Sequence, residues 1–465
     1  MIKSCLNLNR STSALILFSG LSLSGCVKED PLKPNFLIIL TDDLTYRALG
    51  YNNELVKTPN LDKLARQGII FDRAYISTPV CAASRASMLT GLYPQTNGTV
   101  ALDTKSFIKN IVQEKRFKTL PQVLNEAGYK SYFSGKSHLG DPKDYGFHFG
   151  KETPDYDDKT AFEDVYGFID SPEFGQKPFL LWLAVRQPHV PLKPEEKWLK
   201  LYSETNFPIE KNFLKEPPSE SFYNQGLPGE NFYRDSDYTD NYKNLPAGPP
   251  RPVEVIREFT KAYYATISHL DFQIGELIDQ LQSKNLFENT VLIFLSDNGY
   301  FLGNHGLGNK LTMHEESVRV PMFIYWDKLP KTNIHSDALV SSVDVFPTIL
   351  DLAGIDIPDY LQGISLKPLL ANPSMQLNEY VASESVGVGG ELGLGHRMIV
   401  KDKWKYILSD TGDEALFYLE DDLYEIDNLI DDIQHQGEVF KLKAFLIDWK
   451  NKTGDNKDIP VGMPK

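Results

Sequence analysis

Cysteine is scarce in this chain of 465 residues, which contains only Cys5, Cys26 and Cys81. The first two lie in a distinct N-terminal segment, so one cysteine remains for the folded protein. A single thiol cannot form an internal disulfide, and a disulfide-stapled fold is therefore excluded. The presence of Cys81 needs another explanation.

Dense runs of lysine or arginine are also absent, and the formal net charge is −15 at pH 7. This composition predicts no nucleic-acid partner, because such proteins carry a basic patch or stripe. The hydrophobic and charged fractions, 41% and 24%, are typical of a globular protein. The length allows one large or two moderate domains, each with a sizeable core.

The N-terminal segment has the pattern of an export signal. Lys3 and Arg10 precede the apolar run Ala14–Leu23, which is too short to span a bilayer. The run ends in Leu23-Ser24-Gly25-Cys26, which resembles the bacterial lipobox, whose cysteine is lipidated and becomes the new N-terminus. We predict a lipoprotein signal peptide at 1–25, a linker at 26–33 and a lipid anchor on Cys26 that holds a periplasmic or cell-surface protein at a bacterial membrane. An ordinary signal peptide is the alternative.

Apolar strand patterns and amphipathic helix patterns alternate after residue 34. This alternation predicts an α/β fold with a mostly parallel sheet sandwiched by helices. The expected strands are Asn35–Leu40, Ile69–Ala74, Tyr129–Ser134, Phe179–Val185, Val291–Leu295 and Val320–Trp326. The expected helices begin at Thr58-Pro59 and span Leu120–Ala127, Val253–Ser283 and Val343–Leu352.

The pattern changes toward the C-terminus, where we predict a smaller antiparallel α+β subdomain at 374–465. Its expected elements are three strands and a closing helix, Arg397–Val400, Lys405–Leu408, Phe417–Tyr424 and Val439–Asn451. The catalytic domain would then be 34–373. Residues 190–252 have little periodicity and form an excursion within it, and such long irregular stretches are usually functional or disordered.

Four of the expected strands end in polar residues of catalytic types. In open α/β sheets, ligands bind beyond the carboxyl ends of the strands, so these groups are expected to converge. They are Asp42, Asp43, Lys136, His138, His189, Asp297 and Asn298. Asp42, Asp43, Asp297 and Asn298 supply only oxygen ligands, which suit Ca²⁺ or Mg²⁺. A cation surrounded by lysine, arginine and histidine would receive a tetrahedral oxyanion.

Cys81 lies at the predicted mouth of a short helix, one turn before Arg85. Helix N–H groups and a guanidinium both favour a thiolate, which points to a reactive group. A cysteine packed as a small apolar residue is the alternative. The helix pattern alone leaves both open.

The motif around Cys81 resembles the signature of formylglycine-dependent sulfatases of the alkaline-phosphatase superfamily. The similar stretches are Cys81-Ala82-Ala83-Ser84-Arg85 and Leu89-Thr90-Gly91. Supporting stretches include Thr58–Asp62, Gly135–His138, Ser296–Gly299 and Lys310-Leu311-Thr312. Gln187–Pro191 is similar to the branch that includes iduronate-2-sulfatase.

The resemblance implies that a formylglycine-generating or radical maturation enzyme oxidises Cys81 to formylglycine, whose hydrate supplies the nucleophile. It further implies that Asp42, Asp43, Asp297 and Asn298 bind Ca²⁺, with Mg²⁺ as the second choice, together with the formylglycine oxygen. Arg85 would position the hydrate, and Lys136 and Lys310 would contact the sulfate. His138 would be the base, and His189 would bind sulfate or protonate the leaving oxygen.

The predicted substrate is a sulfated polysaccharide or oligosaccharide, with its selection assigned to the excursion and the C-terminal subdomain. Six aromatic residues of the excursion could form stacking walls or its own small core, namely Phe222, Tyr223, Phe232, Tyr233, Tyr238 and Tyr242. The alternatives are a formylglycine-dependent phosphonate monoester or phosphodiester hydrolase and a non-catalytic glycan-binding lipoprotein. We expect structural roles for His305 and His314, and a surface position for Arg397.

Overall fold

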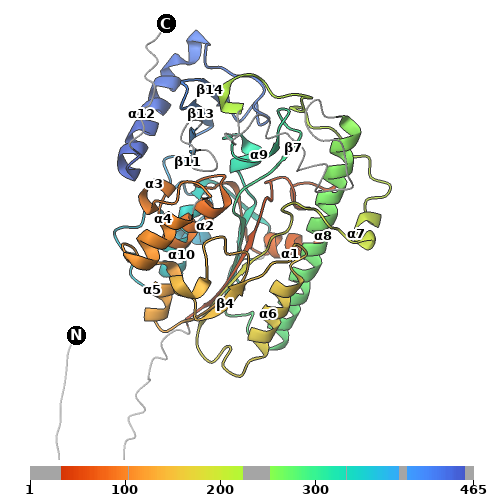
Figure 1. Ribbon diagram of the computed structural model, residues 1–465, viewed down its shortest axis with the longest axis vertical. Coiled ribbons are helices and arrows are strands. Elements are labelled where there is room, and N and C mark those ends of the chain that lie inside the picture. Colours follow the sequence, from red (N-terminus) through yellow and green to blue (C-terminus); the bar gives the residue numbers. More distant parts are fainter. Residues whose placement is uncertain (1–32, 103, 224–251, 331, 387–394, 456–465) are drawn as a thin grey trace, which may run out of the picture. The chain divides into compact units, whose positions relative to one another are not determined.

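A computed structural model describes residues 33–102, 104–223, 252–330, 332–386 and 395–455 (Figure 1). The predicted signal peptide, Cys26 and all of the predicted linker except Lys33 lie outside these residues. So do Phe232, Tyr233, Tyr238 and Tyr242. No helix in the described ranges is long and apolar enough to cross a membrane.

The large sheet is centred on β1 (Asn35–Thr41), whose residues are all buried. It pairs in parallel with β5 (Phe179–Ala184) on one side and β6 (Thr290–Ser296) on the other. The order across the sheet is β10-β2-β9-β6-β1-β5-β3-β4. The other strands are β2 (Ile69–Tyr75), β3 (Lys130–Gly135), β4 (Phe149–Glu152), β9 (Met322–Tyr325) and β10 (Ile334–Ser341). Only β9 runs antiparallel to its neighbours in this sheet as described, so the predicted mostly parallel arrangement is confirmed.

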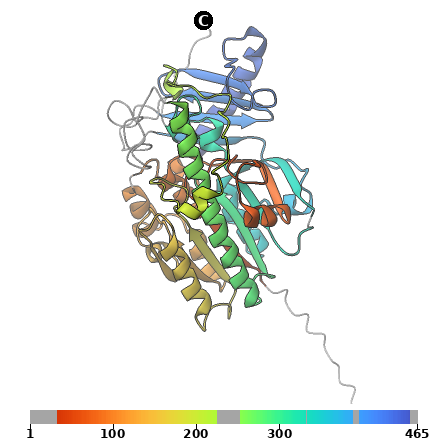
Figure 2. The same ribbon diagram turned by 90° about the vertical axis from the view of Figure 1, so that its right-hand side faces the viewer.

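Helices cover both faces of this sheet, as Figures 1 and 2 show. Phe36, Ile38 and Leu40 share a core with α2 (Cys81–Thr90), α5 (Leu120–Glu126) and α10 (Val345–Leu352). Leu37 and Ile39 face the opposite core, which contains α1 (Pro59–Arg66), α6 (Lys159–Asp170) and α8 (Val253–Ser283). Alternate residues of one strand therefore enter two cores, which explains its unbroken apolar sequence.

The long helix α8 fixes the segment that joins β1 to α1. The Tyr263 hydroxyl accepts a hydrogen bond from the backbone N–H of Thr45 (3.1 Å) and donates one to the carbonyl of Asp43. Two turns further along, the Asp271 carboxylate accepts from the backbone N–H groups of Asn60 (3.2 Å) and Leu61 (2.7 Å) at the start of α1. The bounds predicted for α8 are confirmed.

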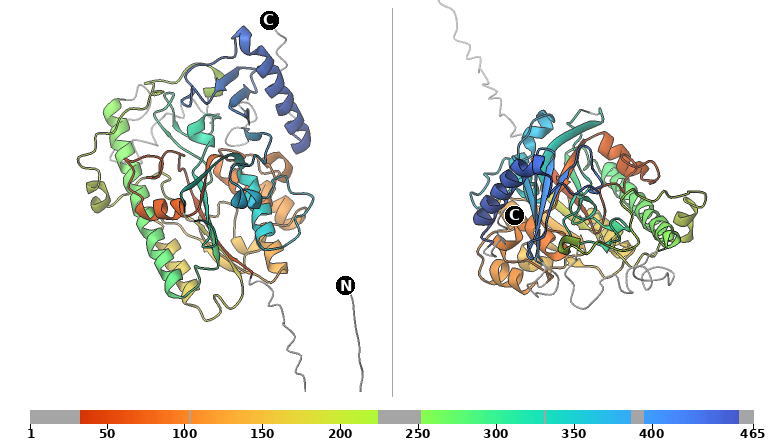
Figure 3. Two further views of the ribbon diagram at one scale, coloured as in Figure 1. Left: turned by 180° about the vertical axis from the view of Figure 1, so that it is seen from behind. Right: turned by 90° about the horizontal axis from the view of Figure 1, so that it is seen from above.

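A second, antiparallel sheet forms near the C-terminus (Figure 3). Its strands, in order, are β11 (Val381–Ser385), β12 (His396–Lys401), β13 (Trp404–Ser409) and β14 (Glu414–Tyr418). The helix α12 (Gln436–Thr453) packs on it through Leu442, Leu446 and Trp449. The small antiparallel subdomain is thus confirmed, whereas its boundary at residue 374 stays a prediction.

The remaining α-helices and strands of the described chain are short. They are α3 (Pro94–Asn97), α4 (Lys105–Phe107), α7 (Glu196–Lys200), α9 (Glu315–Val318), α11 (Lys367–Ala371), β7 (Phe301–Leu302) and β8 (Gly308–Asn309).

Two expectations for the C-terminal part were wrong. The strand predicted to reach Tyr424 ends at Tyr418, because the acidic run that follows turns back and the N–H groups of Asp421 and Asp422 donate to the Tyr418 carbonyl. Arg397 is buried on β12, where its guanidinium binds Asp455 and Asp410. A partner 58 residues away made that burial invisible to local sequence patterns.

Candidate active site

The polar residues predicted at the strand ends do meet at one edge of the large sheet. The parallel register pairs Thr41 with Ser296, so Asp42 and Asp297 leave their strands side by side. The backbone N–H of Asp297 donates to the Thr41 carbonyl at 3.0 Å, which continues the ladder for one more residue. Asp43 then turns the chain in the left-handed region at φ 66°, a conformation that aspartate tolerates better than most residues.

Arg85 ties three of these segments together. It lies one helical turn into α2 and is buried. Its Nε donates to Oδ2 of Asp297 at 2.7 Å, its Nη2 lies 3.5 Å from Oδ2 of Asp42, and its Nη1 donates to the Lys136 carbonyl at 2.7 Å. Burial opposes its charge, but Asp297 and Asp42 raise the pKa of Arg85, so the guanidinium stays protonated.

Two lysines complete a ring of opposite charges. Lys136 forms an ion pair with Asp42, and Lys310 forms one with Asp43. Burial alone would raise the pKa of Asp42, yet Lys136, His189, Arg85 and Lys310 hold it well below its usual value. For Asp297, burial prevails over Arg85 and raises the pKa to about 7.

Three oxygens in this ring have no hydrogen-bond partner: Oδ1 of Asp42, Oδ1 of Asp297 and Oδ1 of Asn298. Oδ1 of Asp42 is 3.9 Å from Nζ of Lys310, which is beyond hydrogen-bonding distance. Buried polar atoms without partners are costly, and a bound ion is one of the recognised explanations for them. An all-oxygen set of carboxylates and one amide fits a hard divalent cation such as Ca²⁺.

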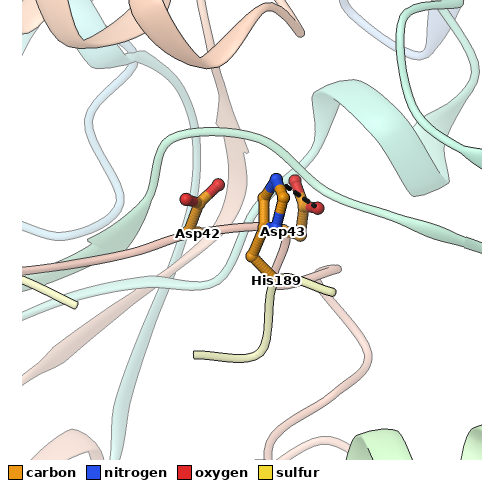
Figure 4. A group of neighbouring side chains, drawn as sticks. All are labelled: Asp42, Asp43 and His189. Carbon is orange, nitrogen blue, oxygen red and sulfur yellow. Dashed lines mark ion pairs between the residues drawn. The ribbon is translucent and has the colours of Figure 1, made fainter. Parts of the chain in front are cut away.

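The histidine His189 lies at the border of the ring. Its Nε2 is 3.7 Å from Oδ2 of Asp43 (Figure 4). Its Nδ1 is 2.5 Å from the Val190 carbonyl. Asp42, Asp43 and His189 are close enough to hold one metal ion together. Burial lowers the pKa of His189, although the neighbouring Asp43 carboxylate raises it, so the imidazole of His189 is largely neutral at pH 7.

Cys81 is the first residue of α2 and is buried. Its Sγ is 3.3 Å from Nδ1 of His138, which adopts a left-handed conformation at φ 60°. Burial, Lys136 and Arg85 lower the pKa of His138 to about 4, so His138 is a neutral proton acceptor near neutral pH. A neutral base, His138, thus lies beside the side chain of Cys81.

Counting charges shows what the ring can do. When all three carboxylates are ionised, Asp42, Asp43 and Asp297 balance Arg85, Lys136 and Lys310, so a bound divalent cation would leave the site positive. Positive charge in a buried site stabilises an anion and the charge that develops as it reacts. The arrangement is suited to binding and cleaving an anionic ester.

A model of the sulfatase family matches residues 34–355. The chain belongs to the sulfatase family. As a member, it is a sulfuric ester hydrolase. A second model, for the C-terminal part of N-sulphoglucosamine sulphohydrolase, matches residues 303–452 of this sulfatase.

Individual relatives agree with this assignment. The sulfatase is 30% identical to N-acetylglucosamine-6-O-sulfatase of Bacteroides thetaiotaomicron over 78% of this chain and 75% of the relative. It is 27% identical to human iduronate 2-sulfatase over 70% of each chain. In fold it resembles a protein solved in complex with its substrate D-glucosamine-2-N,6-O-disulfate, with a TM-score of 0.78 and 24% identity over 92% of this chain and all of that one.

The ten residues predicted from the sulfatase pattern all lie within the matched range. Hydrogen bonds and ion pairs join eight of them, and the other two, Cys81 and His138, contact each other. The sequence did not indicate how the segment that follows Lys310 is fixed, although Glu315 is among the stretches similar to sulfatases. Leu311 donates its backbone N–H to Oγ of Ser317 on α9 (3.1 Å), and Glu315 on the same helix forms an ion pair with Lys405 of β13. The expectation that His305 and His314 are structural stays a prediction. Both are buried, with ring centres 4.5 Å apart, and His305 Nε2 lies 3.7 Å from Oε2 of Glu316.

Proposed function

We propose that this sulfatase removes sulfate from a sulfated carbohydrate, with Cys81 converted to formylglycine and with Ca²⁺ as the bound cation. The observation that carries the proposal is the set of three partnerless oxygens among three cations. One of these cations, Arg85, lies one helical turn after Cys81 on α2. The names of the relatives, N-acetylglucosamine-6-O-sulfatase and iduronate 2-sulfatase, support a sugar substrate.

In this proposal Asp42, Asp43, Asp297 and Asn298 hold the cation. Formylglycine at position 81 supplies a hydrated aldehyde as the nucleophile, and the cation supplies Lewis-acid polarisation. Arg85 orients the residue at position 81 through its fixed place between two carboxylates.

The remaining residues act on the substrate and its protons. Lys136 and Lys310 bind the sulfate oxygens, since both ammonium groups are buried and aimed into the ring. His138 accepts a proton from the group at position 81, and its lowered pKa keeps the imidazole unprotonated and available for this role near neutral pH. His189 binds the sulfate or protonates the leaving oxygen.

The experiment is a mass measurement paired with an activity assay. The protein is expressed with a maturation enzyme, and the peptide containing Cys81 is weighed; conversion of thiol to aldehyde lowers its mass by about 18 Da. Sulfate release is then measured on sulfated sugars, with an aryl phosphodiester in parallel and Cys81→Ala as the control. A peptide that stays a thiol, with no sulfate released, refutes the proposal, and faster phosphodiester turnover would favour the phosphorus alternative.

We further propose that the mature protein is an exported bacterial lipoprotein anchored through Cys26. The charged start, the short apolar run and the lipobox-like Leu23–Cys26 support this. Metabolic labelling with a fatty acid tests it, because Cys26→Ala would abolish labelling while Cys5→Ala would not.

A further inference from the structure

A second group of charged residues lies near His189, outside the ring of opposite charges formed by Asp42, Asp43, Asp297, Arg85, Lys136 and Lys310. The ring of Tyr156 is the nearest aromatic neighbour that the described residues offer to His189, with the two ring centres 6.4 Å apart. Tyr156 is half-buried and belongs to the loop between β4 and α6. The loop therefore borders the place where the sulfate-bearing group of a substrate would sit.

This loop is fixed to the strand end that carries His189. Nε and Nη2 of Arg186 donate to the Thr153 carbonyl at 3.1 and 2.8 Å. The buried carboxylate of Asp158 accepts the backbone N–H groups of Arg186 (2.8 Å) and Gln187 (2.9 Å). Bonds on both sides of Tyr156 thus hold its ring in place before any substrate arrives, which reduces the entropic cost of binding.

Two cations lie against the Tyr156 ring, but only one is neutralised. Cζ of Arg186 is 5.5 Å from the ring centre, and Nη2 of Arg186 pairs with Glu152 at 3.0 Å. Nζ of Lys193 is 5.8 Å from the same centre, within cation–π range. Among the residues that the structure describes, Lys193 has no carboxylate within ion-pair distance, and its side chain is exposed.

We propose that Lys193, held against Tyr156, binds a second anionic group of the substrate, either a carboxylate or a further sulfate on the same or the adjoining sugar. The inference deepens the proposed action on a sulfated carbohydrate and rests on it. Lys193 lies against the same Tyr156 ring that neighbours His189, and of Arg186 and Lys193 it is the cation without a carboxylate partner among the described residues. A charged hydrogen bond to a carboxylate or sulfate is the interaction that such an exposed ammonium can form. The protein as a whole is acidic, so such a polyanion depends on local positive charge for its capture.

The test compares Lys193→Ala with Lys197→Ala. Lys197 is also exposed and lies over an aromatic ring, that of Trp198 at 4.9 Å, but it pairs with Glu195 and does not contact Tyr156. Dissociation constants are measured by calorimetry, and kcat and KM by sulfate release. The substrates are a monosulfated sugar, a disulfated sugar and a monosulfated disaccharide containing a uronate.

We expect Lys193→Ala to weaken binding of the doubly anionic sugars by about three- to tenfold, with KM rising and kcat nearly unchanged. The monosulfated sugar should be unaffected, and Lys193→Arg should restore most of the loss. The sugar that responds identifies carboxylate or sulfate as the second group. Equal effects on all three substrates, no effect, or the same loss in Lys197→Ala would overturn the inference. Because binding is measured apart from turnover, absent sulfate release would count against the proposed reaction alone.

Discussion

The ion pairs of Lys405 give the sharpest stability prediction. Lys405 on β13 is fully buried, with Nζ 2.9 Å from Oε1 of Glu315 and 2.8 Å from Oε1 of Glu425. The other oxygen of Glu425 accepts the backbone N–H of Glu315 at 2.7 Å, at the start of α9. These contacts join the small sheet to the segment that carries Lys310.

The substitution Lys405→Met keeps the apolar stem and removes the charge. Glu315 then retains Arg319 at 3.3 Å, while Glu425 loses its cation. Removing one partner of a buried ion pair costs about 3–5 kcal/mol of unfolding free energy. At about 2 °C per kcal/mol for a large domain, the thermal midpoint should fall by ~6–10 °C.

The loss should also depend on pH. Burial raises the pKa of Glu425 to about 7 even with Lys405 present. Without Lys405 it rises further, so the folded variant binds a proton that the unfolded chain releases, and its stability falls as pH rises through 7. The difference from wild type should therefore be larger at pH 8.5 than at pH 6.

Thermal unfolding followed by circular dichroism at one scan rate measures both effects. Lys403→Met is the matched control, because Lys403 pairs with Asp337 at 2.9 Å in an exposed position and should cost under ~1 kcal/mol. If Lys405→Met unfolds at the same temperature as Lys403→Met, the buried pairs do not stabilise the protein and the reasoning fails.

Two further predictions concern the site. Gly135, just before Lys136, has φ +109°, and an added Cβ would lie 1.9 Å from the Ala184 carbonyl oxygen, so Gly135→Ala should leave little folded protein. Gly128 is the control: it has φ +91° with nothing within 4 Å of an added Cβ, so Gly128→Ala should cost only ~1–2 kcal/mol of unfolding free energy. Similar soluble yields of the two variants would contradict this. Removing the cation with a chelator should lower the activity and the thermal midpoint. Ca²⁺ at about 100 times its Kd should then restore ~2.7 kcal/mol of unfolding free energy. A Ca²⁺-induced rise in the thermal midpoint that persists in Asp297→Asn would place the ion elsewhere.

The sequence revealed the strands that carry the site, because β1, β5 and β6 are short apolar runs that end in charged or polar residues and β3 leads directly into Lys136 and His138. β1, β3, β5 and β6 begin and end within one residue of the expected bounds. Parallel strands that are buried on both faces do not alternate between apolar and polar residues, so they are recognised as continuous apolar runs, and the polar residues that follow mark where burial ends. These strand ends supply seven of the ten predicted site residues, whereas Cys81 and Arg85 come from α2 and Lys310 from the segment before α9.

Other features depend on contacts between distant parts of the chain. β10 contains His335, Ser336 and Asp337 and looks like a loop, yet pairing with β2 makes it a strand. The burial of Lys405 rests on Glu315, 90 residues away. No spacing rule encodes such a pair, because either residue alone is typical of a solvent-exposed surface.

The two anchors on α8 limit where this protein can change length. Tyr263 and Asp271 lie eight residues apart on a rigid helix, about 12 Å along its axis. One inserted residue between them would rotate one anchor by about 100° relative to the other, so either the Asp43 turn or the start of α1 would lose its support. The stretch between β1 and α1 can therefore lengthen only as a loop that leaves both ends in place, and insertions during evolution are expected there or beyond the ends of α8 rather than within it.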